Sequence, residues 1–162
     1  MIRSIYYTQA GKLQTDIDPI NLAFALHDPG GLLWLDFQGA PNIEAEPILL
    51  KTFGFHPLAV DDALSETHVP KLDDWGTFLY IVLHAVVFDQ EEGDVETREL
   101  DVFLCSNFIV THHDESIDAV DRLWSIFQRD DRYLKNGPDH LFYRLVDEIA
   151  SSYMPVVDQL DL

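Results

Sequence analysis

The spacing of apolar and polar positions in the first 65 residues predicts a hairpin, a buried strand and three helices. Two short extended runs flank Ala10-Gly11, which is typical of a hairpin. Asp18 is a cap residue followed by proline at the first helical position, and the turn-forming residues 28–31 would stop that helix. The predicted elements are, in order, strands 2–8 and 12–15, a helix from 19 to about 27, a buried strand 32–36, a helix capped by Asn42 and closed by Gly54, and a helix from Pro57 to about Ser65.

Between residues 71 and 112 the hydrophobic pattern changes to that of strands. Four runs, 71–75, 77–88, 95–105 and 108–112, are rich in β-branched and aromatic residues. Turn signals at 91–94 and at Ser106-Asn107 separate the last three, which predicts adjacent antiparallel strands. In residues 81–87 both alternating sets are largely apolar, so this strand is expected to lie centrally and to be covered on both faces. His84 within it is expected to be a hydrogen-bonded core histidine.

The last third of the chain returns to helical spacing. One helix is predicted from about Ser116, and its apolar stripe comprises Ile117, Val120, Leu123, Trp124 and Phe127. A second starts at Pro138, and its stripe comprises Leu141, Leu145, Ile149 and Tyr153. Pro155 should bend this helix without ending it. Because no glycine, basic last turn or proline closes the helix, the polypeptide is expected to continue beyond Leu162.

Helices on both sides of a block of strands indicate the fold class, α/β. We expect an α/β/α sandwich with a mixed, largely antiparallel central sheet, helices on both faces and the start of a long C-terminal stalk helix. The expected division is an α/β/α domain over residues 1–136 and the beginning of the stalk over 137–162. The length of 162 residues suits one domain with a sizeable core.

The charge balance narrows the possible partners. Asp and Glu total 29 against 10 Lys and Arg, a formal net charge of −19. Nucleic acid is therefore not expected as a partner, because phosphate binding needs a basic face, whereas an acidic surface concentrates cations. The single cysteine, Cys105, rules out an intrachain disulfide and indicates a reducing, cytosolic setting. The longest apolar run, 78–88, is too short to span a bilayer, so the chain as it stands is expected to be soluble.

Two groups of side chains are candidates for metal chemistry. His112, His113 and Asp114 would suit a soluble metal-dependent hydrolase, although successive strand side chains point to opposite faces. Asp61 and Asp62 are adjacent on a predicted short helix, so their side chains diverge by about 100° and cannot act as an acid–base pair. One of them can bridge locally while the other points outward as a hard oxygen ligand. The chain carries no nucleotide-binding loop, catalytic serine motif or zinc-protease motif, and it is not expected to be an enzyme.

The segment that contains this acidic pair resembles the CorA family of magnesium and cobalt transporters. Residues 56–64 match the family's His-Pro-Leu-x-x-acid-Asp-x-Leu pattern. The resemblance extends over nearly the whole sequence from about Trp34. Its further motifs, in order, are Pro70-Lys71, the strand 80–84, the strand pair 99–104 and 107–111, Gly137-Pro138-Asp139 with 141–143, and 153–156 with Asp158.

This resemblance implies a function for the chain. It implies the cytoplasmic regulatory domain of a divalent-cation transporter, a homopentamer attached to the membrane through the part that follows Leu162 and lying on the cytoplasmic face. It also implies a regulatory Mg²⁺ ion, with Co²⁺ as a second candidate, bound between neighbouring subunits by Asp62 with Asp61 beside it. In the isolated chain that binding should be weak, because the partner carboxylate lies on the neighbouring subunit. A zinc-transporting relative and a metal-independent interaction module are the alternatives.

Overall fold

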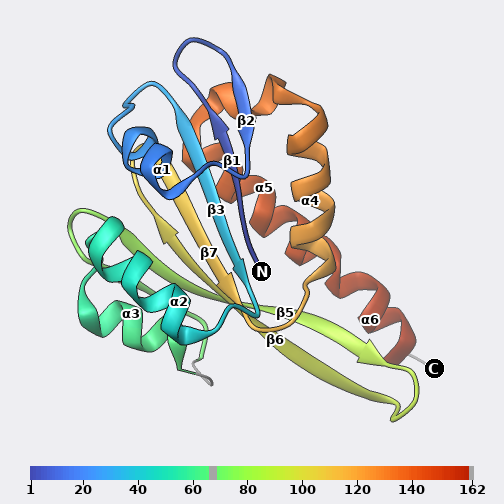
Figure 1. The fold of residues 1–162 in the computed structure, drawn as a ribbon. Coiled ribbons are helices and arrows are strands. Elements are labelled where there is room, and N and C mark those ends of the chain that lie inside the picture. Colours follow the sequence, from blue (N-terminus) through green and yellow to red (C-terminus); the bar gives the residue numbers. More distant parts are fainter. Residues whose placement is uncertain (66–68, 161–162) are drawn as a thin grey trace.

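Two layers of helices enclose a mixed β-sheet in the computed structural model, which describes residues 1–65 and 69–160 (Figure 1). The strands, in chain order, are β1 (Ile2–Tyr7), β2 (Leu13–Thr15), β3 (Leu32–Gln38), β4 (Lys71–Asp74), β5 (Leu79–Asp89), β6 (Asp94–Leu104) and β7 (Phe108–His113). The helices are α1 (Pro19–Leu26), α2 (Asn42–Pro47), η1 (Ile48–Thr52), α3 (Pro57–Leu64), α4 (Asp118–Arg129), η2 (Asp131–Asn136), α5 (Gly137–Ser151) and α6 (Tyr153–Leu160). The predicted α/β/α sandwich is confirmed.

The strand order across the sheet is β2-β1-β3-β7-β6-β5-β4 in the described residues. β3 and β7 run parallel, and the remaining neighbours in this order are antiparallel. The parallel pair lies at the centre, where Trp34 is in register with Ile109 and Asp36 with Thr111. The chain leaves β3, builds α2 to β6 and returns to β3 through β7, so residues far apart in sequence meet on the two central strands.

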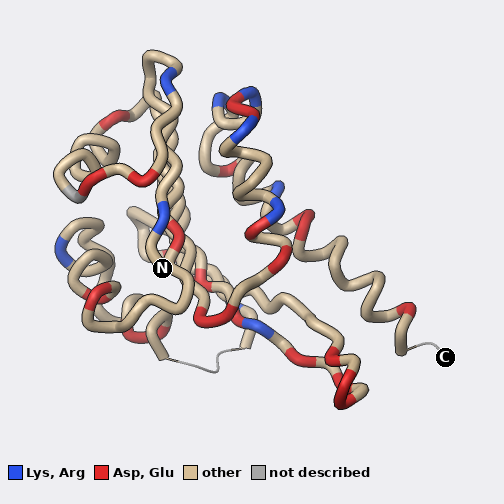
Figure 2. Tube along the Cα trace, turned by 45° about the vertical axis from the view of Figure 1, so that its right-hand side comes forward, with Lys and Arg blue, Asp and Glu red and all other residues tan. Residues whose placement is uncertain are grey.

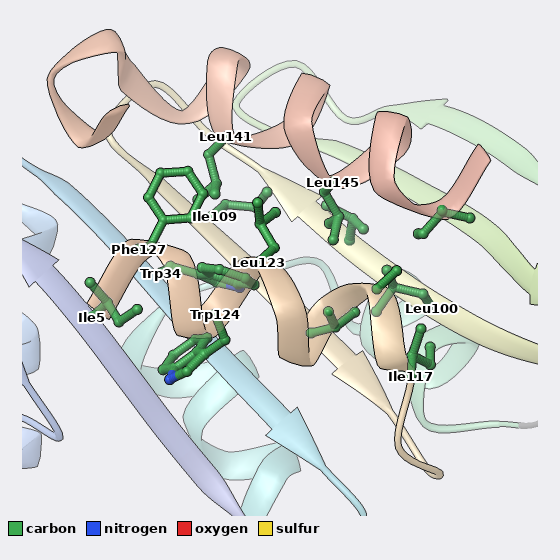
Figure 3. Packing of buried hydrophobic residues seen from close by; sticks show 14 of the residues in the cluster. Ile5, Trp34, Leu100, Ile109, Ile117, Leu123, Trp124, Phe127, Leu141 and Leu145 are labelled. Atoms are coloured by element: carbon green, nitrogen blue, oxygen red, sulfur yellow. The ribbon is translucent and has the colours of Figure 1, made fainter. Parts of the chain in front are cut away.

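Each face of the sheet carries its own apolar core. On one face α4 and α5 pack over the central strands, where Trp34 lies against Trp124 and Phe127 (Figure 3). The apolar stripes predicted for the last two long helices account for much of this core. On the other face α1, α2, η1 and α3 cover a second cluster that includes Phe37, Tyr80 and Phe103. A side chain's position along a strand therefore decides which helical layer it meets.

The helix predicted from Asn42 to Gly54 is divided. Its N-cap is Pro41 rather than Asn42, and α2 gives way after Pro47 to a π-helical segment. In that segment the Phe53 amide donates to the Ile48 carbonyl, five residues earlier, at 3.1 Å. Pro47 has no amide hydrogen to donate to the Ile43 carbonyl, and the winding changes directly after it. Gly54 closes the segment at a φ of 68°, as predicted for a helix stop.

The strand that was predicted to be central, β5, lies second from the edge of the sheet. Its first half pairs with the edge strand β4, but residues 83–89 extend beyond β4 in a long hairpin with β6. Leu83 and Val86 are therefore half-buried rather than enclosed. The residues of β5 are apolar on both faces partly because α6 packs beside residues 85–88.

The C-terminal apolar stripe continues across an interruption at Ser152. α5 ends at Ser151 and α6 begins at Tyr153, because Pro155 has no amide hydrogen and its ring would clash with the carbonyl four residues earlier. Val156 on α6 remains buried, and the Tyr153 hydroxyl donates to the His84 carbonyl on β5. The helical C-terminal stretch is confirmed up to Leu160, and the last two residues of the expected 137–162 segment lie outside the described residues.

Candidate metal-binding site

The segment that carries the acidic pair forms helix α3. The His56 side chain caps it by accepting a hydrogen bond from the Leu58 amide at 3.1 Å, and Pro57 occupies the first turn. The His56 ring also stacks on Trp75, with ring centroids 4.4 Å apart. Ala59, Val60 and Ala63 are buried against the sheet. Asp61 is exposed, whereas Asp62 is half-buried beside Lys71 of β4.

The two aspartates of α3 have different surroundings. Asp62 Oδ2 accepts a hydrogen bond from Lys71 Nζ at 2.8 Å, and the same ammonium group contacts Asp73 Oδ2 at 2.9 Å. The hydrogen bonds to Asp62 and Asp73 raise the pKa of Lys71. Asp61 is exposed, and its carboxylate forms no hydrogen bond or ion pair with the residues that the structure describes. Asp62 is thus the locally bridged member of the pair and Asp61 the outward one.

His112 and His113 do not converge on one site. His113 points to the α4–α5 face, where its Nε2 lies 3.0 Å from Asp36 Oδ1. His112 points to the opposite face, with its ring 6.4 Å from that of Phe37. This geometry argues against the hydrolase alternative, which needs both imidazoles and Asp114 around one ion.

A buried ionic network connects β1, β3 and β7. Asp36 is fully buried and accepts hydrogen bonds from Arg3 Nε at 2.8 Å and Thr111 Oγ1 at 2.5 Å, besides its contact with His113. His113 Nδ1 lies 2.6 Å from the Glu115 carbonyl oxygen. Both ring nitrogens of His113 face acceptors, which favours the imidazolium form, because only that form can donate from both nitrogens.

The pKa values of the two groups follow from this arrangement. Burial raises the pKa of Asp36, but the hydrogen bonds from His113 and Thr111 and the charges of His113 and Arg3 outweigh it, so the net shift is downward. Burial lowers the pKa of His113, but the hydrogen bond and charge of Asp36 outweigh that effect, so the net shift is upward. Each group therefore stabilises the charged form of the other.

A second buried carboxylate lies on the opposite face of the sheet. Asp101 Oδ1 accepts a hydrogen bond from the Tyr80 hydroxyl at 2.5 Å, and Asp101 Oδ2 lies 3.6 Å from His112 Nδ1. Burial, only partly offset by these neighbours, raises the pKa of Asp101 to about 6. Sequence reasoning overlooked Asp101, although a lone acid between Leu100 and Val102 in an apolar strand is a signal of a buried polar site.

No three or more His, Cys, Asp or Glu side chains within residues 1–65 and 69–160 are grouped so that they could hold a metal ion. The chemistry of Asp61 and Asp62 nevertheless suits Mg²⁺, which takes one or two carboxylates and retains several waters. None of the helices in the described part of the chain is long and apolar enough to cross a bilayer.

The fold is that of the soluble domain of a known class of metal-ion transporter. It matches the structure of the soluble domain of CorA from Methanocaldococcus jannaschii with a TM-score of 0.76 and 21% identity, over 99% of this chain and 60% of that one. The family described as "CorA-like Mg2+ transporter protein" matches residues 29–162. The chain belongs to the CorA family, which is a family of transporters rather than of enzymes.

Curated relatives agree with this assignment. The putative metal ion transporter YfjQ of Bacillus subtilis is 30% identical over 128 residues, which make up 79% of this chain and 39% of the relative. The cobalt/magnesium transport protein CorA of Thermotoga maritima is 21% identical over 148 residues, 91% of this chain and 41% of the relative. The chain thus spans about two fifths of the length of these relatives.

Proposed function

We propose that this chain is the cytoplasmic, metal-sensing domain of a CorA-type transporter of divalent cations, with Mg²⁺ and Co²⁺ as the transported ions. Asp62, with Asp61 beside it, binds a regulatory Mg²⁺ ion between neighbouring subunits of a homopentamer. The observation that carries the proposal is that α3, in a chain of the CorA family, places an exposed Asp61 beside Asp62, whose side chain is 33% exposed. A relative named for cobalt and magnesium transport supports the choice of ions.

In a single chain, the ammonium group of Lys71 is the cation next to Asp62. Its ammonium group lies between the Asp62 and Asp73 carboxylates and offsets part of their charge. A divalent ion supplies more positive charge than this ammonium and can also accept a carboxylate from a neighbour. When Mg²⁺ binds, Asp62 therefore replaces its bond to the Lys71 ammonium group with a bond to an ion that is shared between subunits.

The overall charge of the chain makes subunit contact dependent on cations. Acidic residues outnumber basic ones nearly threefold, and Figure 2 shows red segments along the β5–β6 hairpin and near the end of α3. Carboxylates that face each other across an interface repel unless a cation lies between them. When cytoplasmic Mg²⁺ falls, the subunits relax and the pore opens, which is feedback through differential binding to two states.

Asp62→Ala in the full-length protein should abolish the protection from proteolysis that Mg²⁺ confers, because the interface loses its ligand. The measurement is limited trypsin digestion in Mg²⁺ and in chelator. Asp94→Ala removes the same charge at the start of β6 and should retain the protection. Unchanged protection in Asp62→Ala would remove this residue from the sensor, and a gene that encodes no apolar spans after residue 162 would contradict the transporter assignment.

Lys71→Met should lower the Mg²⁺ concentration that gives half-maximal protection by about two- to fivefold, in line with the strength of a partly exposed ion pair. The physical reason is that the competing ammonium group is gone, while the methionine retains most of the aliphatic stem. The same digestion, carried out over a series of Mg²⁺ concentrations, measures the effect. A higher requirement for Mg²⁺ would show that Lys71 supports ion binding rather than competing with it.

A further inference from the structure

A pocket of about 490 Å³ lies where the middle of β5 and of β6 and the C-terminal end of β7 meet the C-terminal end of α3. It is separate from the outer side of α3 that carries Asp61. His84, Glu99, Asp101 and His112 are among its lining residues. The register places them in two neighbouring rows, with Asp101 opposite His112 and His84 opposite Glu99. The face is the one covered by α1–α3, because Tyr80 and Phe103, at alternate positions on the same strands, belong to that core.

His112 is buried and lacks a hydrogen-bond partner among the described residues. Its side chain is 3% exposed, and neither Nδ1 nor Nε2 forms a hydrogen bond within that part of the chain. A buried polar group in this state costs free energy, and the great majority of such groups in proteins are satisfied by a side chain, water or a ligand. His112 lines the pocket, so a species in the pocket can satisfy it.

Asp101 provides a second possible metal ligand, and a hydrogen bond holds its orientation. The Tyr80 hydroxyl binds Oδ1, which leaves Oδ2 directed at His112 Nδ1 at 3.6 Å. This separation is too long for a direct hydrogen bond. It is close to the distance of about 3.3 Å between neighbouring donors in a tetrahedral site with metal bonds of about 2.0–2.1 Å. A hydrogen bond to a ligating carboxylate from an outer residue is a regular feature of metal sites.

The charge and accessibility of the pocket favour a cation. Its lining includes the acidic residues Glu99, Asp101, Asp114 and Glu115, and its guanidinium group, that of Arg98, is paired with Glu115 at 3.1 Å. Ser65 and Thr97, which also line the pocket, are exposed. An anionic ligand would meet a surplus of carboxylates.

From these observations we propose that His112 and Asp101 bind a transition-metal ion such as Co²⁺ or Zn²⁺, at a second metal site within a single subunit. Imidazole together with one carboxylate suits these ions, whereas Mg²⁺ prefers oxygen ligands throughout. Two protein donors are in place, and water completes the coordination. The site is independent of the regulatory Mg²⁺ that we assign to the subunit interface, and it makes the domain responsive to a different class of ion.

Titration of the purified chain with Co²⁺ tests this inference, because Co²⁺ bound to nitrogen and oxygen ligands gives visible absorption bands that Zn²⁺ abolishes by displacement. We expect one Co²⁺ ion per chain and no displacement by an equal concentration of Mg²⁺. His112→Phe and Asp101→Asn should each weaken binding by at least about tenfold. Tyr80→Phe leaves both donors but removes the bond that orients Asp101, and it should weaken binding by about tenfold.

Two control variants test whether Co²⁺ binding is confined to this pocket. His140 also has a buried, unpartnered ring nitrogen among the described residues, but it lies on α5, so His140→Phe should leave Co²⁺ binding unchanged. Asp62→Asn should do the same, which separates this site from the proposed Mg²⁺ sensor. Absence of Co²⁺ binding, or equal binding by wild type and His112→Phe, would overturn the inference. If His112→Phe does not fold by circular dichroism, the Asp101→Asn and Tyr80→Phe variants decide.

Discussion

Asp36→Ala is expected to lower the free energy of unfolding by about 3–5 kcal/mol, because it breaks a buried ionic network and leaves its partners buried. Arg3, Thr111 and His113 all donate to this carboxylate, which is fully excluded from solvent. In a chain of this length such a loss corresponds to a decrease in Tm of about 10 °C. Urea denaturation and thermal unfolding of the purified chain measure the effect.

Asp121→Asn is the matched control for this variant. Asp121 binds the same arginine, with Arg3 Nη2 2.8 Å from Oδ1, but its side chain is 43% exposed. The expected loss is below about 1 kcal/mol, as for other exposed ion pairs. If both substitutions lower the free energy of unfolding by the same amount, burial of Asp36 is not the reason for the loss in Asp36→Ala.

The contribution of the Asp36–His113 pair should depend on pH in both directions. The pKa of Asp36 is lowered in the folded state, so its contribution is present above the unfolded value of about 4 and is lost as pH falls through the folded value. The pKa of His113 is raised, so its contribution is full below about 6.5 and is lost as pH rises through the folded value. The difference in stability between wild type and Asp36→Ala should therefore be largest between about pH 4 and 6.5.

Phe127→Ala is expected to destabilise the chain by about 3–5 kcal/mol, because it opens a cavity in the core beneath α4. Phe127 is fully buried, with its ring edge-on to Trp34 at 6.2 Å between centroids (Figure 3). Urea denaturation gives the free energy, and the change in near-ultraviolet circular dichroism reports the altered packing around the tryptophans.

Phe24→Ala deletes the same side chain from another helix, α1, where it is 80% exposed. The expected change is within about 0.5 kcal/mol, as for surface substitutions in general. The contrast between two identical deletions isolates burial as the cause. A large loss of stability in Phe24→Ala, or a small one in Phe127→Ala, would contradict the placement of Phe127 in the core and of Phe24 on the surface.

The sequence around Asp61 and Asp62 predicts part of the geometry of the candidate site. Adjacent positions on a helix diverge by about 100°, and the structure indeed separates an exposed Asp61 from a bridged Asp62. The partner that makes this bridge, Lys71, comes from β4, and no local pattern indicates that contact. Whether the pair binds Mg²⁺ between subunits remains a prediction, which the Asp62→Ala experiment addresses.

The sequence alone determined the kind and order of most elements, because hydrophobic period, caps and turn residues act within a few positions. It also determined that His112 and His113 face opposite ways, since that follows from the strand period. Only the tertiary structure decided that β5 lies beside an edge strand, that Asp36 meets His113 across 77 positions, and that Tyr80 orients Asp101 toward His112. Strand order and register bring these residues together, and both depend on packing between distant segments that no local pattern encodes.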